Sequence, residues 1–279
     1  MQQDSRLQEA SRRWALVTGA SAGIGAEFCR QLAARGYNLV MVARRQEKMA
    51  DLADELQQQF GTRSRVYPSD LAVPGASAGL ASWLLEQNID VEFLVNNAGY
   101  GLPGHFTDVP WKSHADFIQL MLTAICELSW QLLPAMQARK RGYVINVASL
   151  AGLVPGSAGH TLYGASKAFL VRFSQSLALE NEANGVHVSA LCPGFTYSEF
   201  HDVTGTRGLV NKLPGWMWMT AEDVVSYGIA SVVGKRPLMV AIPGRVNRLI
   251  EWLLRCLPSA AGYWVTRRMS GRIRAQKTA

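Results

Sequence analysis

Short apolar runs alternate with longer amphipathic or mixed stretches along most of the chain. The apolar runs predict strands at residues 14–18, 39–43, 65–67, 93–96, 143–148, 188–192 and 238–242. The stretches between them predict helices at residues 27–35, 46–60, 78–87, 111–139, 164–183 and 221–233. Strands that are apolar on both faces and alternate with helices are typical of a parallel sheet covered on both sides. The pattern therefore predicts an α/β fold with a doubly wound parallel sheet of the Rossmann type.

The regular alternation does not extend to the two ends of the chain or to one internal segment. Residues 1–12 form a polar lead of mixed charge, and residues 13–245 form the predicted Rossmann-type domain. Within that domain, residues 195–219 are interrupted by glycines and prolines, which indicates an insert rather than a core unit. Residues 246–279 form a C-terminal extension. The sequence therefore predicts a single domain plus an extension.

Composition limits the class of protein. An apolar content of 48% over 279 residues is sufficient for a sizeable core, which excludes disorder for most of the chain. No run of about 18 uninterrupted apolar residues is present, so a membrane-spanning helix is not expected. The four cysteines lack CxxC spacing and the N-terminal residues lack the apolar core of a signal peptide, which favours a cytoplasmic protein. The five histidines show no metal-ligand spacing, so no metal is expected.

The net charge of +7 is concentrated near the C-terminus. Residues 245–279 contain eight cations and one acidic residue, Glu251, so the rest of the chain is neutral overall. A nucleic-acid-binding protein is expected to spread its cations over a face of its fold, and this class is excluded. In the extension, arginines alternate with apolar residues such as Trp252 and Trp264. Such a stretch can lie on an anionic membrane surface, or it can pack on its own protein or a neighbouring subunit.

A glycine-rich turn follows the first predicted strand, with the sequence Thr18-Gly19-Ala20-Ser21-Ala22-Gly23-Ile24-Gly25. Glycines allow a tight turn and a close backbone approach to a pyrophosphate, which then binds the N–H groups at the start of the next helix. The spacing is GxxxGxG rather than GxGxxG. An ordinary strand-to-helix turn is the alternative, but the position and context favour nucleotide binding.

Two arginines, Arg44 and Arg45, follow Ala43 at the end of the second predicted strand. An acidic residue here would accept hydrogen bonds from the ribose hydroxyls of NAD and would repel a 2′-phosphate. Ala43 does neither, and a guanidinium group matches the geometry of a phosphate. The sequence therefore favours NADP(H), with the alternative that the two arginines only begin a solvated helix.

Tyr163 and Lys167 lie four residues apart at the start of an apolar predicted helix, a spacing that places both on one helix face. A lysine cation is expected to lower the pKa of the phenol from its usual value of about 10. Ser149 follows the predicted strand 143–148, and in a doubly wound sheet the carboxyl end of a strand faces the ligand crevice. Ser149, Tyr163 and Lys167 are the candidate catalytic residues.

These motifs together resemble the short-chain dehydrogenase/reductase family over residues 13 to about 245. The matches are Thr18–Gly25 for its TGxxxGxG turn, Asn96–Gly99 for its NNAG box, Ser149 with Tyr163-xxx-Lys167, Asp70-Leu71, and Pro193-Gly194 followed by Thr196. The resemblance implies phosphate contacts around Ser21–Ile24, an adenosine site at 70–71 and 97–99, and a nicotinamide site at 193–196. The expected cofactor-binding set is Gly19, Ser21, Ala22, Gly23, Ile24, Gly25, Arg44, Arg45, Asp70, Leu71, Asn97, Ala98, Gly99, Tyr163, Lys167, Pro193, Gly194 and Thr196.

The resemblance also implies an activity, the NADP(H)-dependent interconversion of a ketone and a secondary alcohol. Tyr163 would give its proton to the carbonyl oxygen, Ser149 would hydrogen-bond that oxygen, and Lys167 would hold the ribose and tune Tyr163. The helix at 111–139 would build a subunit interface, so a homodimer or homotetramer is expected. Cytoplasmic localisation is expected, with peripheral contact of residues 246–274 with a membrane as an open alternative.

The insert at 195–219 corresponds to a substrate lid in the family. Its run Pro214-Gly215-Trp216-Met217-Trp218-Met219 would form an adaptable apolar wall, or would pack on the body or a partner subunit. An apolar lid favours a lipophilic substrate. The candidates are a long-chain 3-oxoacyl compound, a steroid-like ring system or another bulky ketone.

Met121 departs from the family pattern, because it occupies the place of an asparagine that helps to connect the lysine to solvent through a water. Methionine cannot make that hydrogen bond. Either helix geometry or another polar group, such as Thr123, restores the proton relay, or turnover is slow or lost. The second function hypothesis is therefore an NADP(H)-binding sensor or scaffold with little turnover.

Overall fold

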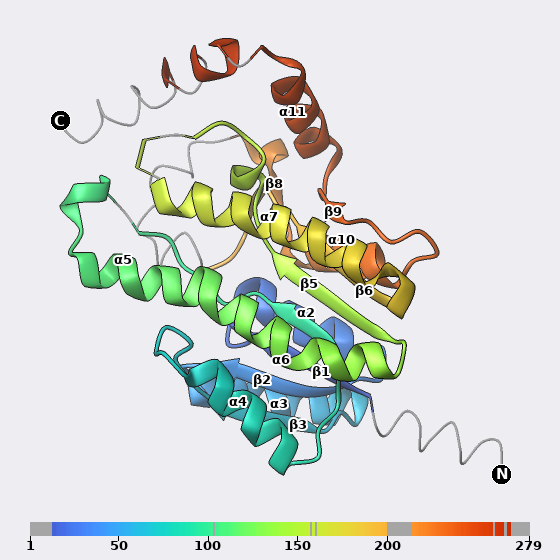
Figure 1. Cartoon of the computed structure of the whole chain (residues 1–279). Coiled ribbons are helices and arrows are strands. Elements are labelled where there is room, and N and C mark those ends of the chain that lie inside the picture. The colour runs from blue at the N-terminus through green and yellow to red at the C-terminus, as the bar shows by residue number, and fades with distance from the viewer. Residues whose placement is uncertain are drawn as a thin grey trace.

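The computed structural model describes residues 13–102, 104–156, 158–159, 161–199, 214–258, 260–264 and 267–268. Over these ranges, the main sheet has seven parallel strands in the order β3-β2-β1-β4-β5-β6-β9 (Figure 1). The strands are β1 (Trp14–Thr18), β2 (Asn38–Ala43), β3 (Ser64–Pro68), β4 (Val91–Asn96), β5 (Gly142–Val147), β6 (Val186–Leu191) and β9 (Val240–Ala241). A two-stranded sheet is formed by β7 (Phe195–Thr196) and β8 (Trp218–Met219).

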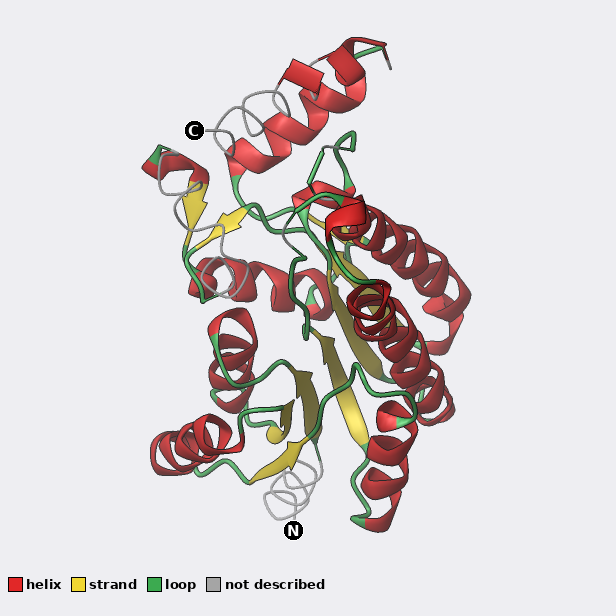
Figure 2. Ribbon diagram, turned by 90° about the vertical axis from the view of Figure 1, so that its left-hand side faces the viewer, coloured by secondary structure: helices red, strands yellow, loops and turns green. Residues whose placement is uncertain are grey.

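Helices cover both faces of the main sheet (Figure 2). One face carries α2 (Gly23–Ala33), α3 (Gln46–Phe60) and α10 (Ala221–Val233), and the other carries α4 (Ala76–Glu86), α6 (Ala124–Ala138) and α7 (Thr161–Asn181). The neighbours Phe93 and Leu94 in β4 are both fully buried, each in the core on a different face. Burial on both faces explains why the strands are continuous apolar runs, and it confirms the predicted Rossmann-type fold.

The strand order reverses at β1, which pairs with β2 on one side and with β4 on the other. In open α/β sheets, ligands bind at such a reversal, in the crevice outside the carboxyl ends of the strands. Thr18 ends β1 and Asn96 ends β4. The fold therefore brings the glycine-rich turn and the segment 96–99 together at this crevice.

Most predicted elements are shifted by one to four residues at their ends, and two differ more clearly. The predicted strand 238–242 is wrong in length, because β9 spans only Val240–Ala241 at the sheet edge and the Leu238 N–H donates to the Ser231 carbonyl instead. The predicted helix 111–139 is divided into α5 (Trp111–Ile118), a π-helical turn η2 (Gln119–Thr123) and α6. In η2, the Ala124 N–H donates to the Gln119 carbonyl five residues earlier. Such π-turns are frequent at functional sites.

One helix of the described residues, Trp111–Ala138, is long and apolar enough by composition to cross a membrane, with a mean hydropathy of 1.2. Its inner side chains, including Leu120, Leu128 and Met136, are buried in the core against the sheet. Only 39% of its most apolar window is buried, so its place in one layer of the fold explains part of its apolar character.

The chain continues past the sheet as α11 (Arg245–Cys256), at the top of the view in Figure 1. Leu249, Trp252 and Leu253 on this helix are exposed, whereas Asn247 in its first turn is buried. A Cβ at the buried Gly262 would lie 3.4 Å from Cγ of Pro155, so the chain beyond α11 contacts the body again.

Candidate active site

The glycine-rich turn after β1 has a geometry that only glycine satisfies without strain. Gly19 and Gly23 have φ values of +68° and +54°. A Cβ at Gly25 would lie 2.1 Å from the Gly19 carbonyl oxygen. Ala22, the N-cap of α2, makes no side-chain cap hydrogen bond, and the first turn of the helix has no acidic residue. The first N–H groups of α2 are therefore suited to bind a phosphate.

Thr18 and Asn97 join this turn to the segment after β4. Thr18 Oγ1 accepts hydrogen bonds from the backbone N–H groups of Asn97 (2.9 Å) and Ala98 (3.0 Å). The Asn97 amide donates to the Thr18 carbonyl at 2.9 Å. The two segments that were predicted to bind the cofactor are thus brought together and fixed to each other.

Arg45 forms part of a charged cluster beside the glycine-rich turn. Its guanidinium donates to Oγ of Ser21 (3.1 and 3.2 Å) and pairs with the Glu199 carboxylate at 2.9 Å. Lys48 pairs with the same carboxylate at 3.0 Å. Hydrogen bonds from Lys48 and Arg45 lower the pKa of Glu199 below its usual value. The cluster places two cations beside the glycine-rich turn, and Glu199 was not a candidate from the sequence.

Arg44 pairs with the carboxylate of Asp70 at 3.6 Å, so these two predicted cofactor residues also lie together. The Asp70 carboxylate accepts a hydrogen bond from the Ala72 N–H at 3.0 Å. Leu71 is different, because its side chain is buried in the core beneath α4. A contact between Leu71 and a cofactor would therefore involve its backbone.

Ser149, Tyr163 and Lys167 meet at the carboxyl end of β5 and the first turns of α7. The Lys167 ammonium donates to the Val147 carbonyl at 2.7 Å and lies 5.7 Å from the Tyr163 ring centroid. Ser149 is hydrogen-bonded to the phenol of Tyr163, and its hydroxyl accepts from the Ala151 N–H at 3.1 Å. The structure therefore brings the three candidate catalytic residues into one cluster.

Burial determines the pKa values in this cluster. It lowers the pKa of Lys167 to about 8, because the charged ammonium is desolvated. It raises the pKa of Tyr163, with the Ser149 hydrogen bond acting in the opposite direction. The pKa of Tyr163 is therefore raised in this geometry rather than lowered as predicted, because desolvation outweighs the Ser149 hydrogen bond.

The segment predicted to bind a nicotinamide is supported by a residue of the C-terminal extension. A Cβ at Gly194 would lie 2.5 Å from Oδ1 of Asn247, in the first turn of α11. The Asn247 amide donates to the Pro243 carbonyl at 2.8 Å. The Pro193 carbonyl accepts from the Leu150 N–H at 2.9 Å, next to Ser149. The first turn of α11 thus lies against the site, and the sequence carries no signal for this, since Asn247 stands between Val246 and Arg248 in a basic stretch.

Met121 is fully buried in the π-turn η2, and it packs on the NNAG segment. A Cβ at Gly99 would lie 2.9 Å from its sulfur atom. Thr123, the polar residue suggested as a replacement in the proton relay, is exposed, unlike Met121 and Lys167. This placement argues against Thr123 in that role.

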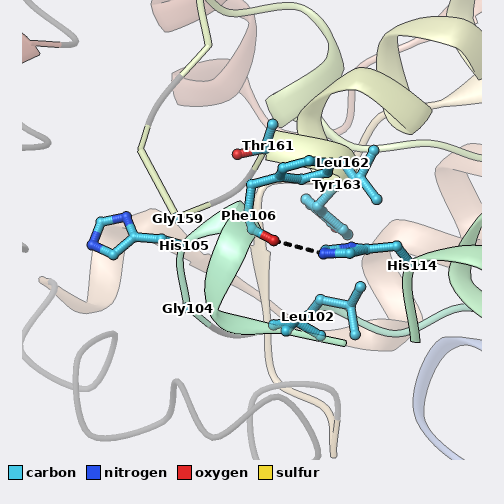
Figure 3. Close-up of a pocket in the computed structure, with 10 residues that line it drawn as sticks. Leu102, Gly104, His105, Phe106, His114, Gly159, Thr161, Leu162 and Tyr163 are labelled. Atoms are coloured by element: carbon cyan, nitrogen blue, oxygen red, sulfur yellow. Dashed lines mark hydrogen bonds between the residues drawn. The ribbon is translucent and has the colours of Figure 1, made fainter. Parts of the chain in front are cut away.

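A small pocket opens beside Tyr163 (Figure 3). It is lined by Leu102, Gly104, His105, Phe106, Val109, His114, Gly159, Thr161, Leu162 and Tyr163. His114 is buried, and its Nε2 lies 2.8 Å from the Phe106 carbonyl oxygen. The sequence did not single out His114. The sequence feature that could have indicated its burial is its spacing: His114 lies three residues before Phe117, so both fall on the buried side of α5.

Part of the predicted lid packs on the body of the protein. Trp218 stacks on Tyr197 with ring centroids 4.7 Å apart, and Trp216 is exposed. Residues 200–213, the centre of the insert, lie outside the described residues. The lid therefore stays a prediction. The Trp218 stacking lies within the insert, because Tyr197 also belongs to it, and packing on the body is observed for Met219, against the core.

The cofactor-binding residues fit a dinucleotide, since a glycine cradle, uncapped helical N–H groups and a cationic cluster line one crevice. No group of three or more metal-binding side chains occurs in the described parts of the chain. The arrangement can bind a dinucleotide next to a buried phenol that can donate a proton.

Several known proteins are similar to this chain in sequence and in fold. Residues 13–206 match the family model for short chain dehydrogenase. A very-long-chain 3-oxoacyl-CoA reductase of Laccaria bicolor is 34% identical over 201 residues, 71% of this chain and 59% of that protein. The chain thus matches about three fifths of the fungal enzyme's length. A 7beta-hydroxysteroid dehydrogenase of Collinsella aerofaciens is 32% identical over 209 residues, 75% of each chain.

A solved structure has the same fold, the short-chain dehydrogenase from Sphingobium yanoikuyae in complex with NADPH. It has a TM-score of 0.76 at 29% identity, and the match covers 89% of this chain and 97% of that one. The family model covers more than half of the chain, in agreement with the motifs and the sheet. The chain belongs to the short-chain dehydrogenase family of oxidoreductases.

Proposed function

We propose that this protein is an NADP(H)-dependent oxidoreductase that interconverts a bulky lipophilic ketone and a secondary alcohol. The observation that carries the proposal is the cluster of Ser149, Tyr163 and Lys167 beside the glycine-rich turn. A buried phenol next to a dinucleotide crevice is suited to donate a proton while a hydride is transferred.

The residues of the chain have distinct roles in the proposed reduction. The nicotinamide, when bound, supplies the hydride to the carbonyl carbon. Tyr163 donates its proton to the carbonyl oxygen, and Ser149 donates a hydrogen bond to the same oxygen. Lys167, fixed at the Val147 carbonyl, stabilises the phenolate that Tyr163 becomes and contributes to binding the ribose. In the oxidation of an alcohol, the same phenolate takes the proton back.

The preference for NADP(H) rests on the charges at the end of β2. Arg44, Arg45 and Lys48 lie on this side of the crevice, and Ala43 has no carboxylate to repel a phosphate. A structural relative was solved with NADPH. These observations support binding of the 2′-phosphate by Arg45 and its neighbours.

The lipophilic substrate class is supported by the pocket beside Tyr163, whose lining includes Leu102, Phe106, Val109 and Leu162. It is further supported by relatives named for very-long-chain 3-oxoacyl-CoA and 7beta-hydroxysteroid substrates. Reduction of long-chain 3-oxoacyl, polycyclic and other bulky ketones can be followed by the absorbance of NADPH. We expect turnover with at least one bulky ketone and none with that ketone in the Tyr163→Phe protein.

A second candidate function, an NADP(H)-binding sensor with little turnover, is favoured by Met121 alone. The same experiment separates the two functions. Tight binding of NADPH without oxidation by any ketone of the panel would support the sensor and contradict the enzyme.

We also propose that the protein is a cytoplasmic homodimer or homotetramer. The outer sides of α6 and α7 expose large apolar residues, among them Trp130, Phe169 and Leu179, which a second copy can cover. The exposed apolar residues of α11 lie among Arg245, Arg248 and Arg255, which keeps peripheral contact with an anionic membrane as the alternative use of this helix.

A further inference from the structure

His114, which lines the pocket beside Tyr163, has a buried nitrogen atom, Nδ1, without a hydrogen-bond partner in the described parts of the chain. The His114 side chain is only 4% exposed, although it belongs to the pocket lining (Figure 3). A buried polar atom without a partner costs free energy unless a ligand satisfies it. The ring that carries this atom lines the pocket beside Tyr163, where the proposed substrate would bind.

The neighbours of His114 determine which kind of group the free nitrogen can bind. Its Nε2 lies 2.8 Å from the Phe106 carbonyl oxygen, and a carbonyl can only accept a hydrogen bond. Nε2 therefore carries the hydrogen, and in the neutral ring Nδ1 carries the lone pair. Nδ1 is consequently an acceptor that requires a donor, such as a hydroxyl group.

The histidine ring is held in place from several sides, which makes Nδ1 a fixed rather than an adaptable acceptor. The Phe106 ring stacks on His114 with centroids 4.6 Å apart, and the Trp111 ring lies 6.2 Å away. The turn that contains Phe106 is itself capped, because Asp108 accepts a hydrogen bond from the His105 N–H at 3.0 Å. A preorganised acceptor of this kind discriminates between ligands by direction as well as by polarity.

Two other roles for His114 are disfavoured by its surroundings. The described residues contain no cluster of three metal-binding side chains, so His114 lacks the partners of a metal ligand. Proton donation to the substrate is already assigned to Tyr163, which is hydrogen-bonded to Ser149. Recognition of a substrate group that lies away from the reacting carbonyl is the role that remains.

We propose that His114 is a specificity-determining residue whose Nδ1 accepts a hydrogen bond from a hydroxyl group of the substrate. The inference rests on the proposed function and refines it. The preferred substrate is then a bulky ketone that also carries a hydroxyl group, rather than a purely hydrocarbon ketone. The hydroxyl lies on the side of the ketone that faces α5.

Two substitutions separate this role from a structural one. In His114→Gln, the amide nitrogen can replace Nε2 and donate to the Phe106 carbonyl, but the acceptor at Nδ1 is lost. In His114→Asn, the amide oxygen can replace Nδ1, but the bond to Phe106 is lost. Both variants are first compared with the parent for NADPH affinity, which reports an intact cofactor site.

The measurement is the ratio of kcat/KM for a polycyclic ketone with a hydroxyl group to that for the same ketone without it. We expect the parent protein to prefer the hydroxylated ketone about tenfold or more, mainly through KM. The ratio should remain high in His114→Asn and fall towards one in His114→Gln. Equal kcat/KM values for the two ketones in the parent, or equal loss of selectivity in both variants, would overturn the proposal.

Failure of the proposed function has a different signature. If the parent oxidises NADPH with neither ketone, the oxidoreductase assignment fails for this substrate class. The role of His114 is then tested by binding, through the increase in Tm that each ketone gives to the NADPH-loaded Tyr163→Phe protein. A larger increase with the hydroxylated ketone that disappears in the Tyr163→Phe/His114→Gln protein supports the proposal. Equal increases with both ketones contradict it.

Discussion

The two sides of the crevice are built in different ways. On the cofactor side, the contacts are local or involve the backbone: Gly25 approaches the Gly19 carbonyl, and Thr18 receives the N–H groups of Asn97 and Ala98. On the substrate side, side chains from distant segments meet: Leu102, Phe106 and His114 line the pocket together with Leu162 and Tyr163 of α7. A backbone-built site tolerates few residue types and leaves a readable motif, whereas a side-chain-built site can vary from one relative to another.

This difference also separates binding from selectivity. The cofactor side offers N–H groups and cations that any dinucleotide phosphate can use. The substrate side presents one phenol, one buried imidazole and apolar walls, which in the proposed function select the ketone. Substitutions on the first side should change affinity for NADPH, and substitutions on the second should change turnover or substrate choice.

The largest effect is expected for Tyr163→Phe. The substitution removes the proton donor but retains the ring beside Lys167, so kcat should fall by about 10²–10⁴-fold. The affinity for NADPH should change little, which fluorescence titration measures. Retention of most of the parent rate on a confirmed ketone would contradict the role of Tyr163.

The next largest effect is expected for Arg45→Ala. A charge-assisted hydrogen bond to a phosphate contributes about 1.5–3 kcal/mol, so the Kd for NADPH should rise by about tenfold or more. The Kd for NADH should change little, because NADH has no 2′-phosphate. An equal rise in the Kd for NADPH and for NADH would contradict a contact between Arg45 and the 2′-phosphate.

Glu199→Gln should have the opposite effect on the affinity for NADPH. Glu199 neutralises Arg45 and Lys48, so its carboxylate competes with a phosphate for the same cations. Removal of this charge should lower the Kd for NADPH by a few-fold and leave that for NADH nearly unchanged. A weaker affinity for NADPH would show instead that Glu199 orients the two cations for the phosphate.

The comparison also explains which features could be predicted from the sequence. The glycine-rich turn and the Tyr163–Lys167 pair were predictable, because both depend on local spacing in a turn and in a helix. The Arg45–Glu199 pair was not, because 154 residues separate its members and Glu199 belongs to no motif. The π-turn was also missed. One extra residue turns the following side chains by about 100°, but residues 117–138 have a single charge and are apolar on nearly all sides, so the shift leaves no visible break in the pattern.

A smaller effect, on vesicle binding or on oligomer size, is expected for substitutions on the exposed apolar side of α11. If this helix lies on a membrane, the protein should co-sediment with vesicles of anionic lipid, and added salt should weaken the binding. Trp252→Ser with Leu253→Ser should then reduce the bound fraction, without touching the buried Asn247 below. If the helix instead covers a second copy, the parent should not bind vesicles, and the same substitutions should change the oligomer size. A truncation after Gly244 is less informative, because it removes Asn247 and its contact with Gly194.

The smallest effect is expected for Met121→Asn, which restores the residue that the family pattern has in the π-turn. Met121 is fully buried with its sulfur against Gly99, so a smaller, polar side chain should lower the free energy of unfolding by about 1–3 kcal/mol. If proton supply limits turnover, the asparagine should nevertheless raise kcat by a few-fold and reduce the solvent isotope effect. Met121→Leu is the matched control, because it retains an apolar side chain of similar volume. It should change neither kcat nor the solvent isotope effect. A loss of stability without a gain in kcat would show that Met121 packs the NNAG segment and that the proton follows another route.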